Sequence, residues 1–148
     1  MKSLFSILCL LVLVSFQSCD NSKSEIIFHE SHEPSRANVP FSDAVETADF
    51  LFLTGQIGKD HKKGELVSGG IGDETKQVIE NIKAVLEHHH LSLDNVVKCT
   101  VILKDINDFK AFNSVYTTYF TKKPARTTYA AAGLAGGASI EIDVIAAK

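Results

Sequence analysis

The chain has 148 residues, 45% of them hydrophobic and 22% charged, and 15 lysines and arginines against 18 aspartates and glutamates give a formal net charge of −3. This length suits one domain with a sizeable core, and the charge provides no basic surface, so we expect no nucleic-acid partner. Only three cysteines are present, two of them within the first 19 residues, which excludes a disulfide framework.

The N-terminal segment, residues 1–18, is predicted to be a lipoprotein signal peptide. Lys2 precedes an apolar run over 3–16 that is shorter than the roughly 20 residues of a membrane-spanning helix. The run ends in Phe16-Gln17-Ser18-Cys19, which resembles a lipobox with Phe16 in place of the usual leucine. We therefore expect lipidation of Cys19, a polar tether over 19–25, and a bacterial cell-envelope lipoprotein that meets the membrane only through this anchor. An ordinary secretory signal and an uncleaved anchor are the alternatives.

Four segments follow before the first helix. Glu25–His29 is predicted to be a short strand, and Ser31–Pro40, with two prolines, a loop. Asp49–Thr54 is too apolar for a half-exposed strand and is predicted to be buried. Gly55–Gly72, rich in glycine, lysine and aspartate, is predicted to form a loop or hairpin.

The pattern then changes to a helical period. Apolar residues at helical spacing predict a helix over Glu74–His89 with Asp73 as its N-cap. Val96–Leu103 is a second predicted strand, and an aromatic stripe over 109–120 predicts a second amphipathic helix that stops before Pro124.

Two strands, Arg126–Ala132 and Ser139–Ala146, are predicted to close the chain across a Gly/Ala-rich turn. The element order favours an α+β fold, a mixed sheet with two helices on one face, and the uncovered face favours a homo-oligomer. The turn could bring Arg126 and Glu141 side by side. The arginine fork matches a carboxylate, and a glutamate can position water and move protons.

Seven segments carry a resemblance to a known family: Thr54–Ile57, Asn81–Leu86, Val97–Val101, Lys104–Phe109, Asn113–Tyr116, Pro124–Arg126 and Ile140–Ile142. Together they resemble the Rid family of reactive intermediate (enamine/imine) deaminases. The resemblance implies that 26–148 is a Rid-like domain with a chorismate-mutase-like fold, forming a homotrimer with a small-molecule site at each subunit interface. It implies hydrolysis of 2-imino or 2-enamino acids to 2-oxo acids and ammonia, without metal or organic cofactor.

The resemblance assigns the two catalytic roles. Arg126 would bind the substrate carboxylate, the alternative being a surface or intersubunit salt bridge. Glu141 alternates with apolar neighbours, so its side chain leaves the strand on the opposite face. It would orient water and transfer protons, the alternative being a charge on a solvated strand face.

Five further residues are implied to bind substrate. Thr54 and Gly55 match a turn that borders the family's pocket, and Asn113 matches an asparagine near it, although a helix-surface amide is an equal alternative. Phe41 stands where many members carry tyrosine, so a phenol hydroxyl is absent. Thr128 stands where many have cysteine.

The remaining signals favour no further chemistry. His29, His32 and the run His88–His90 have no metal-ligand spacing, so we expect solvated histidines and no metal. Cys99 alternates with valines and is predicted to be buried.

A second function stays open. The same trimer could be a non-catalytic module that binds small carboxylates, such as 2-oxo acids, or acts as a chaperone-like platform. The missing hydroxyl at Phe41 and the predicted export signal motivate this alternative.

Overall fold

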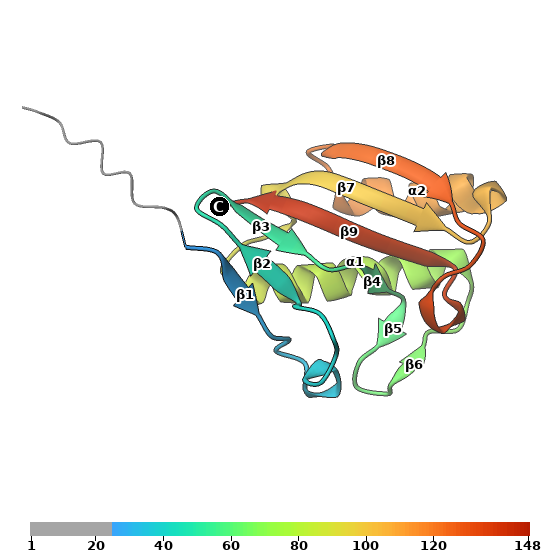
Figure 1. Cartoon of the computed structure of the whole chain (residues 1–148). Coiled ribbons are helices and arrows are strands. Elements are labelled where there is room, and N and C mark those ends of the chain that lie inside the picture. The colour runs from blue at the N-terminus through green and yellow to red at the C-terminus, as the bar shows by residue number, and fades with distance from the viewer. Residues whose placement is uncertain (1–24) are drawn as a thin grey trace, which may run out of the picture.

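A seven-stranded mixed sheet organises the computed structural model, which describes residues 25–148 (Figure 1). Six strands follow the order β1-β2-β3-β9-β7-β8, and β4 pairs with β9 beside β3. A separate hairpin, β5 (Lys59–Asp60) with β6 (Glu65–Leu66), confirms the hairpin alternative for Gly55–Gly72. The sheet strands are β1 (Ile27–His29), β2 (Ala44–Glu46), β3 (Phe50–Leu53), β4 (Gln56–Ile57), β7 (Val96–Leu103), β8 (Ala125–Ala130) and β9 (Ile140–Ala147).

Two helices, α1 (Ile71–His88) and α2 (Phe109–Tyr119), pack on the same face of this sheet (Figure 1). The predicted mixed sheet with two helices on one face is therefore confirmed.

The prediction that Asp73 caps the first helix is wrong, because α1 begins two residues earlier and its N-cap is Gly70. Gly70 has a φ of 77°, a turn conformation that glycine adopts without strain.

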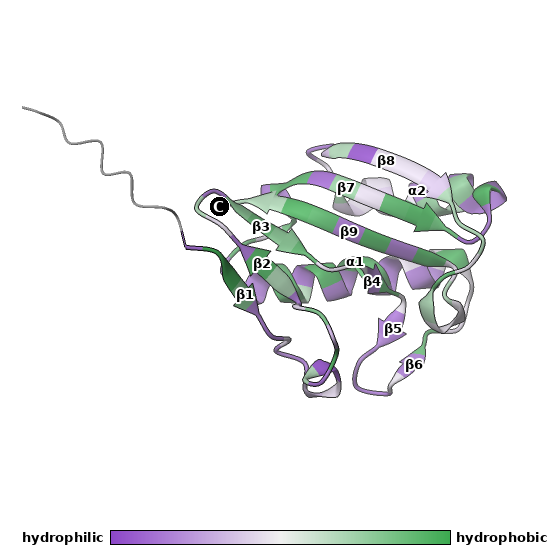
Figure 2. Cartoon of the chain, viewed as in Figure 1, coloured by the Kyte–Doolittle hydropathy of each residue, from purple (hydrophilic) through white to green (hydrophobic). Residues whose placement is uncertain are grey.

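The core lies between the helices and the inner face of the sheet (Figure 2). Alternate residues of β7 and β9 point inward, as expected for strands with one buried face. Cys99 is buried among them, as predicted, and burial raises the pKa of its thiol to about 11. The buried side chains include Val78, Ile79, Ile82, Val85 and Leu86 of α1, Phe112 and Tyr116 of α2, Cys99, Val101 and Leu103 of β7, and Ile140, Ile142 and Val144 of β9.

The opposite face of the sheet is open within one chain. Phe50 and Phe52 are 40% and 38% exposed, and Tyr129 of β8 is 46% exposed. The prediction that Asp49–Thr54 is buried on both faces is therefore wrong for the single chain, since only Leu51 and Leu53 enter the core. An exposed apolar face of this kind is typical of a surface that another subunit covers.

The last two strands are not neighbours. The α2 crossover makes β8 parallel to β7, from Lys98 opposite Ala125 to Leu103 opposite Ala130, and leaves β8 at the edge of the sheet. β9 instead pairs antiparallel with β7 and β3. The prediction that the two final strands close the chain side by side is thus wrong, because β7 lies between them.

The predicted signal peptide, the lipidation of Cys19 and most of the predicted tether lie outside the described residues and stay predictions. Within 25–148, neither helix combines the length and the apolar character that crossing a membrane requires.

Candidate functional site

Four of the predicted site residues line one hollow of about 490 Å³. Phe41, Thr54, Gly55 and Glu141 meet there, at the junction of β4, β9 and the loop before β2. Two side chains of helix α1 hold this junction in place through hydrogen bonds. The amide of Asn81 donates to the carbonyls of both Ile57 and Lys59, and the buried Glu74 carboxylate accepts hydrogen bonds from Ser139 just before β9. The other lining residues are Ser35, Arg36, Val39, Gln56, Ile57, Lys59, His61 and Ala135.

The carboxylate of Glu141 lies against the backbone of Gly55. Glu141 is opposite Ile57 in the β4–β9 pair, and its side chain is half-buried. A Cβ placed on Gly55 would lie 2.1 Å from Glu141 Oε1, so glycine is required for this approach. Burial, followed by the charge of Asp143, raises the pKa of Glu141 above its ordinary value. A carboxyl group with a raised pKa is suited to exchange protons with a substrate.

Substitution of Gly55 by alanine is predicted to displace this carboxylate. The new methyl group would occupy the space of Oε1, so the Glu141 side chain must turn away from the hollow. We expect turnover to fall by about 10²-fold, near the lower end of the contribution of a positioned acid–base group. Steady-state kinetics measures this effect, and Gly133→Ala, where an added Cβ meets no atom within 4 Å, is the matched control.

A buried polar network, which the sequence analysis missed, forms the floor of the hollow. The guanidinium of Arg36 donates to Gln56 Oε1 at 2.7 Å and lies 3.0 Å from Asp43 Oδ1. It also lies 5.7 Å from the centre of the Phe41 ring. Arg36 belongs to a short 3-10 helix, Pro34–Arg36, within a segment that has no periodic pattern. Because Arg36 is already paired with Asp43, it is less available than a free arginine to bind a substrate anion.

His61 is a second lining residue that the sequence did not single out. Its Nδ1 is buried and has no hydrogen-bond partner among residues 25–148. Burial and the nearby Arg36 charge lower the pKa of His61, which favours the neutral imidazole. His61 lies in the turn of the β5–β6 hairpin, and this turn brings it to the hollow. The sequence predicted only a loop or hairpin here, without its strands.

Arg126 lies in a different hollow, of about 370 Å³, between α2 and the start of β8. Its Nη1 donates to Asn113 Oδ1 at 2.9 Å, which places the predicted pair Arg126 and Asn113 together. The guanidinium lies 4.5 Å from the centre of the Tyr116 ring, with Phe109 and Phe112 also within cation–π distance. These contacts hold the arginine fork in place.

No carboxylate of the described part of the chain forms a salt bridge with Arg126. This cation is held by neutral groups and remains free to pair with an acid from outside the chain. Thr128, two residues along the same strand and facing the same side, has a buried hydroxyl without a hydrogen-bond partner in 25–148.

Within one chain, Arg126 and Glu141 face opposite sides of the sheet. Arg126 is opposite the core residue Cys99 in the β7–β8 pair, whereas Glu141 is opposite Ile102, which points to the open face. The expectation that the final turn brings the two residues side by side is therefore wrong for a single chain. The two hollows can form one site only if a second copy brings its arginine to the Glu141 hollow.

Comparisons with known proteins place the chain among relatives of similar length and the same fold. A family model described as Endoribonuclease L-PSP matches residues 30–148. A RutC family protein of Pyrococcus horikoshii is 47% identical over 125 residues, which cover 84% of this chain and 98% of that protein. The human 2-iminobutanoate/2-iminopropanoate deaminase is 44% identical over 108 residues, 72% of this chain and 79% of that protein. The crystal structure of E. coli TdcF with bound serine matches with a TM-score of 0.75 and 28% identity, over 82% of this chain and 98% of that one.

Proposed function

The chain belongs to the endoribonuclease L-PSP family, also called the Rid family, and from this premise we propose that it hydrolyses 2-imino and 2-enamino acids to 2-oxo acids and ammonia. The observation that carries the proposal is the Glu141 carboxylate, which has a raised pKa and lines a hollow beside Gly55. The 44% identity to a human protein named as a 2-iminobutanoate/2-iminopropanoate deaminase supports the choice of substrate class.

The reaction requires an anchor for the acid and a group that moves protons. Arg126 binds the substrate carboxylate through its donor fork. Glu141 accepts a proton from a water whose oxygen bonds to C2 of the imine, and passes that proton to the imine nitrogen. In the resulting carbinolamine, Glu141 transfers the hydroxyl proton to the nitrogen, the C–N bond breaks, ammonia leaves and the C2 carbonyl forms.

The proposed site is shared between two copies of the chain. Since Arg126 and Glu141 face opposite sides of one sheet, Arg126 of one copy must approach the Glu141 hollow of the next. A closed homotrimer would contain three such shared sites, one at each subunit interface. It would also cover exposed apolar side chains of the open sheet face, among them Phe50, Phe52 and Tyr129.

One observation favours the non-catalytic alternative. The ring of Phe41 lines the hollow without a hydroxyl, so it can pack against a ligand but cannot donate a hydrogen bond. In this alternative the same hollows would hold a small carboxylate without turnover.

The deciding experiment is turnover by the purified full chain on a panel of imines generated in the assay from several amino acids. We expect 2-oxo acid to appear faster than by spontaneous hydrolysis for at least one imine. Calorimetry with 2-oxobutyrate accompanies the assay. Binding without turnover across the panel would favour the non-catalytic module, and neither binding nor turnover would contradict both functions.

A further inference from the structure

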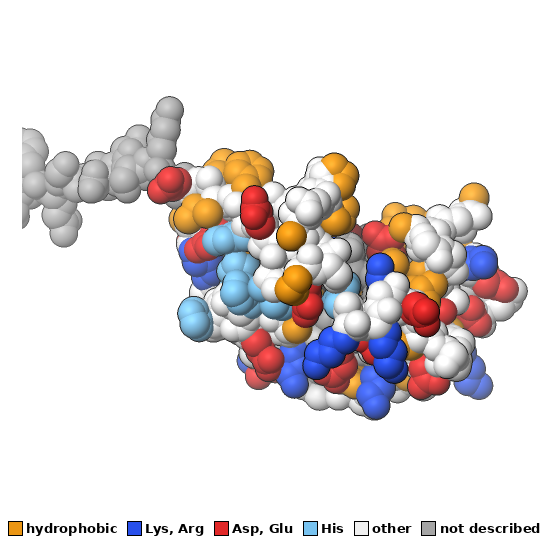
Figure 3. Space-filling model, turned by 90° about the horizontal axis from the view of Figure 1, so that it is seen from below, with side chains coloured by type: hydrophobic (Ala, Val, Ile, Leu, Met, Phe, Trp, Pro, Cys, Tyr) orange, Lys and Arg blue, Asp and Glu red, His pale blue; other side chains and the backbone are white. Residues whose placement is uncertain are grey.

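Five of the six histidines of the chain lie at one end of the molecule, where β1 and β2 pass the C-terminal end of α1. Figure 3 shows pale-blue histidine side chains grouped together on this surface. They lie away from the two hollows described above, whose lining residues include none of them. The five are His29, His32, His88, His89 and His90.

Three side chains of this region converge. His29, Glu46 and His89 each offer one ligand atom, and these atoms all lie within 4.8 Å of one another. Nε2 of His29 is 2.8 Å from Oε2 of Glu46, and the ring centres of His29 and His89 are 4.4 Å apart. The three residues are half-buried, so His29 and His89 are only partly solvated.

The fold fixes this arrangement from three elements. Glu46 is opposite Ile27 in the β1–β2 pair, so Glu46 and His29 project on the same face of the two strands. His89 is the C-cap of α1, and its ring packs against the ring of His29. The side chains therefore come together from three separate elements.

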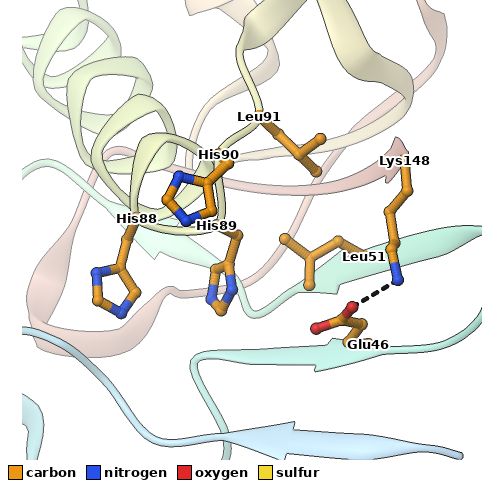
Figure 4. Close-up of a pocket in the computed structure, with 7 residues that line it drawn as sticks. All are labelled: Glu46, Leu51, His88, His89, His90, Leu91 and Lys148. Carbon is orange, nitrogen blue, oxygen red and sulfur yellow. Dashed lines mark hydrogen bonds and ion pairs between the residues drawn. The ribbon is translucent and has the colours of Figure 1, made fainter.

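A hollow of about 390 Å³ is lined by two of the three residues, Glu46 and His89, and leaves room for solvent beside them. It lies between the end of α1 and β2, and Figure 4 shows Glu46, His89 and Lys148 around it. The ammonium of Lys148 is 2.5 Å from Oε1 of Glu46. Oε2 is the hydrogen-bond partner of His29 Nε2, so a cation bound by both atoms would take the place of the proton that they share.

We propose that His29, Glu46 and His89 bind a divalent transition-metal ion of the zinc type. Two imidazoles and one carboxylate are ligands that Zn²⁺ accepts with bond lengths of about 2.0–2.2 Å, and a water from the adjoining hollow would complete a tetrahedron. The hard cations Mg²⁺ and Ca²⁺ require mostly oxygen ligands and are disfavoured. The partial negative charge at the C-terminal end of α1 favours a cation here.

Such an ion would connect the edge strand β1 to the C-terminal end of helix α1. β1 is an edge strand of three residues, and its central residue, Phe28, is 69% exposed. A metal bond from His29 to His89 would connect this strand to α1. The site thus has a stabilising role that is independent of the proposed deaminase chemistry.

Titration of the purified full chain with ZnCl₂ in a calorimeter, after treatment with a chelator, tests the proposal. We expect one ion per chain and a rise in melting temperature that the chelator reverses. His29→Gln and His89→Gln should each weaken binding by more than about 10-fold, since removal of a ligand costs at least as much as removal of its supporting partner. MgCl₂ should give no comparable signal.

His90→Asn is the matched control. His90 lines the same hollow outside the three-residue cluster and has a φ of 60°, which asparagine tolerates. This variant should bind Zn²⁺ as the wild type does. Absence of binding by the wild type would overturn the proposal. So would binding that survives both His29→Gln and His89→Gln, or binding that is lost equally in His90→Asn.

Discussion

Replacement of Glu141 by glutamine is expected to lower kcat by about 10²–10³-fold, within the range of a positioned acid–base group. The amide keeps the size of the side chain beside Gly55 but can neither accept the proton of the attacking water nor return it. In the wild type the carboxylate is the active form, so kcat should fall as the pH drops through the pKa of Glu141. Burial raises that pKa, so the fall begins at a higher pH than for an ordinary glutamate.

Asp143→Asn provides the matched control for Glu141. Asp143 lies on the same face of β9, two residues further on, and it does not line the hollow. Its charge contributes to the raised pKa of Glu141, so its removal should leave the plateau rate nearly unchanged and move the acid limb to lower pH. A Glu141→Gln enzyme with a wild-type rate would contradict the assignment.

A stability measurement separates this catalytic effect from misfolding. A carboxyl whose pKa is raised by folding stabilises the protein below its unfolded pKa, and that contribution is lost as the pH rises through the folded pKa. Glu141→Gln removes this ionisable carboxyl, and with it the loss of stability that its ionisation causes at neutral pH. Its melting temperature at pH 7 should therefore be no lower than that of the wild type.

Replacement of Arg126 by alanine is expected to lower kcat/KM by about 10²–10³-fold, equivalent to about 3–4 kcal/mol. The variant removes the cation that neutral groups, Asn113 and the Tyr116 ring, hold without a salt-bridge partner among residues 25–148. Arg126→Lys should lose most of this activity too, because a point charge cannot reproduce the planar fork.

Lys123→Gln is the control for the loss of charge alone. Lys123 lines the same hollow as Arg126, so its replacement also removes one positive charge there. We expect kcat/KM to change by less than about 3-fold, since surface charges act weakly through water. Equal losses in Lys123→Gln and Arg126→Ala would indicate general electrostatic attraction and would contradict a specific carboxylate anchor.

The fold was largely predictable because long periodic segments determine it. The valine-rich run of β7 and the helical spacing in α1 depend on local patterns, and both were located within a few residues. The three-residue strand β2 has too few residues to show a period. The order of β9, β7 and β8 depends on long-range pairing, which a turn-based interpretation of neighbouring strands does not reveal.

The candidate site was predictable only in part, for a related reason. Motif resemblance named Phe41, Thr54, Gly55 and Glu141, which the structure brings to one hollow. Arg36 and His61 reach that hollow from irregular segments, and no sequence spacing relates them to Glu141. The separation of Arg126 from Glu141 follows from the faces of two strands that are not neighbours.

Mixed assembly of two inactive variants tests most directly whether two copies share each site. Arg126→Ala and Glu141→Gln are co-expressed with different tags, and assemblies carrying both tags are purified and assayed. If one subunit supplies the arginine and its neighbour the glutamate, a mixed trimer has one intact site, and the unsorted equal mixture recovers about a quarter of wild-type turnover. Mixed assemblies as inactive as either parent would contradict a shared site.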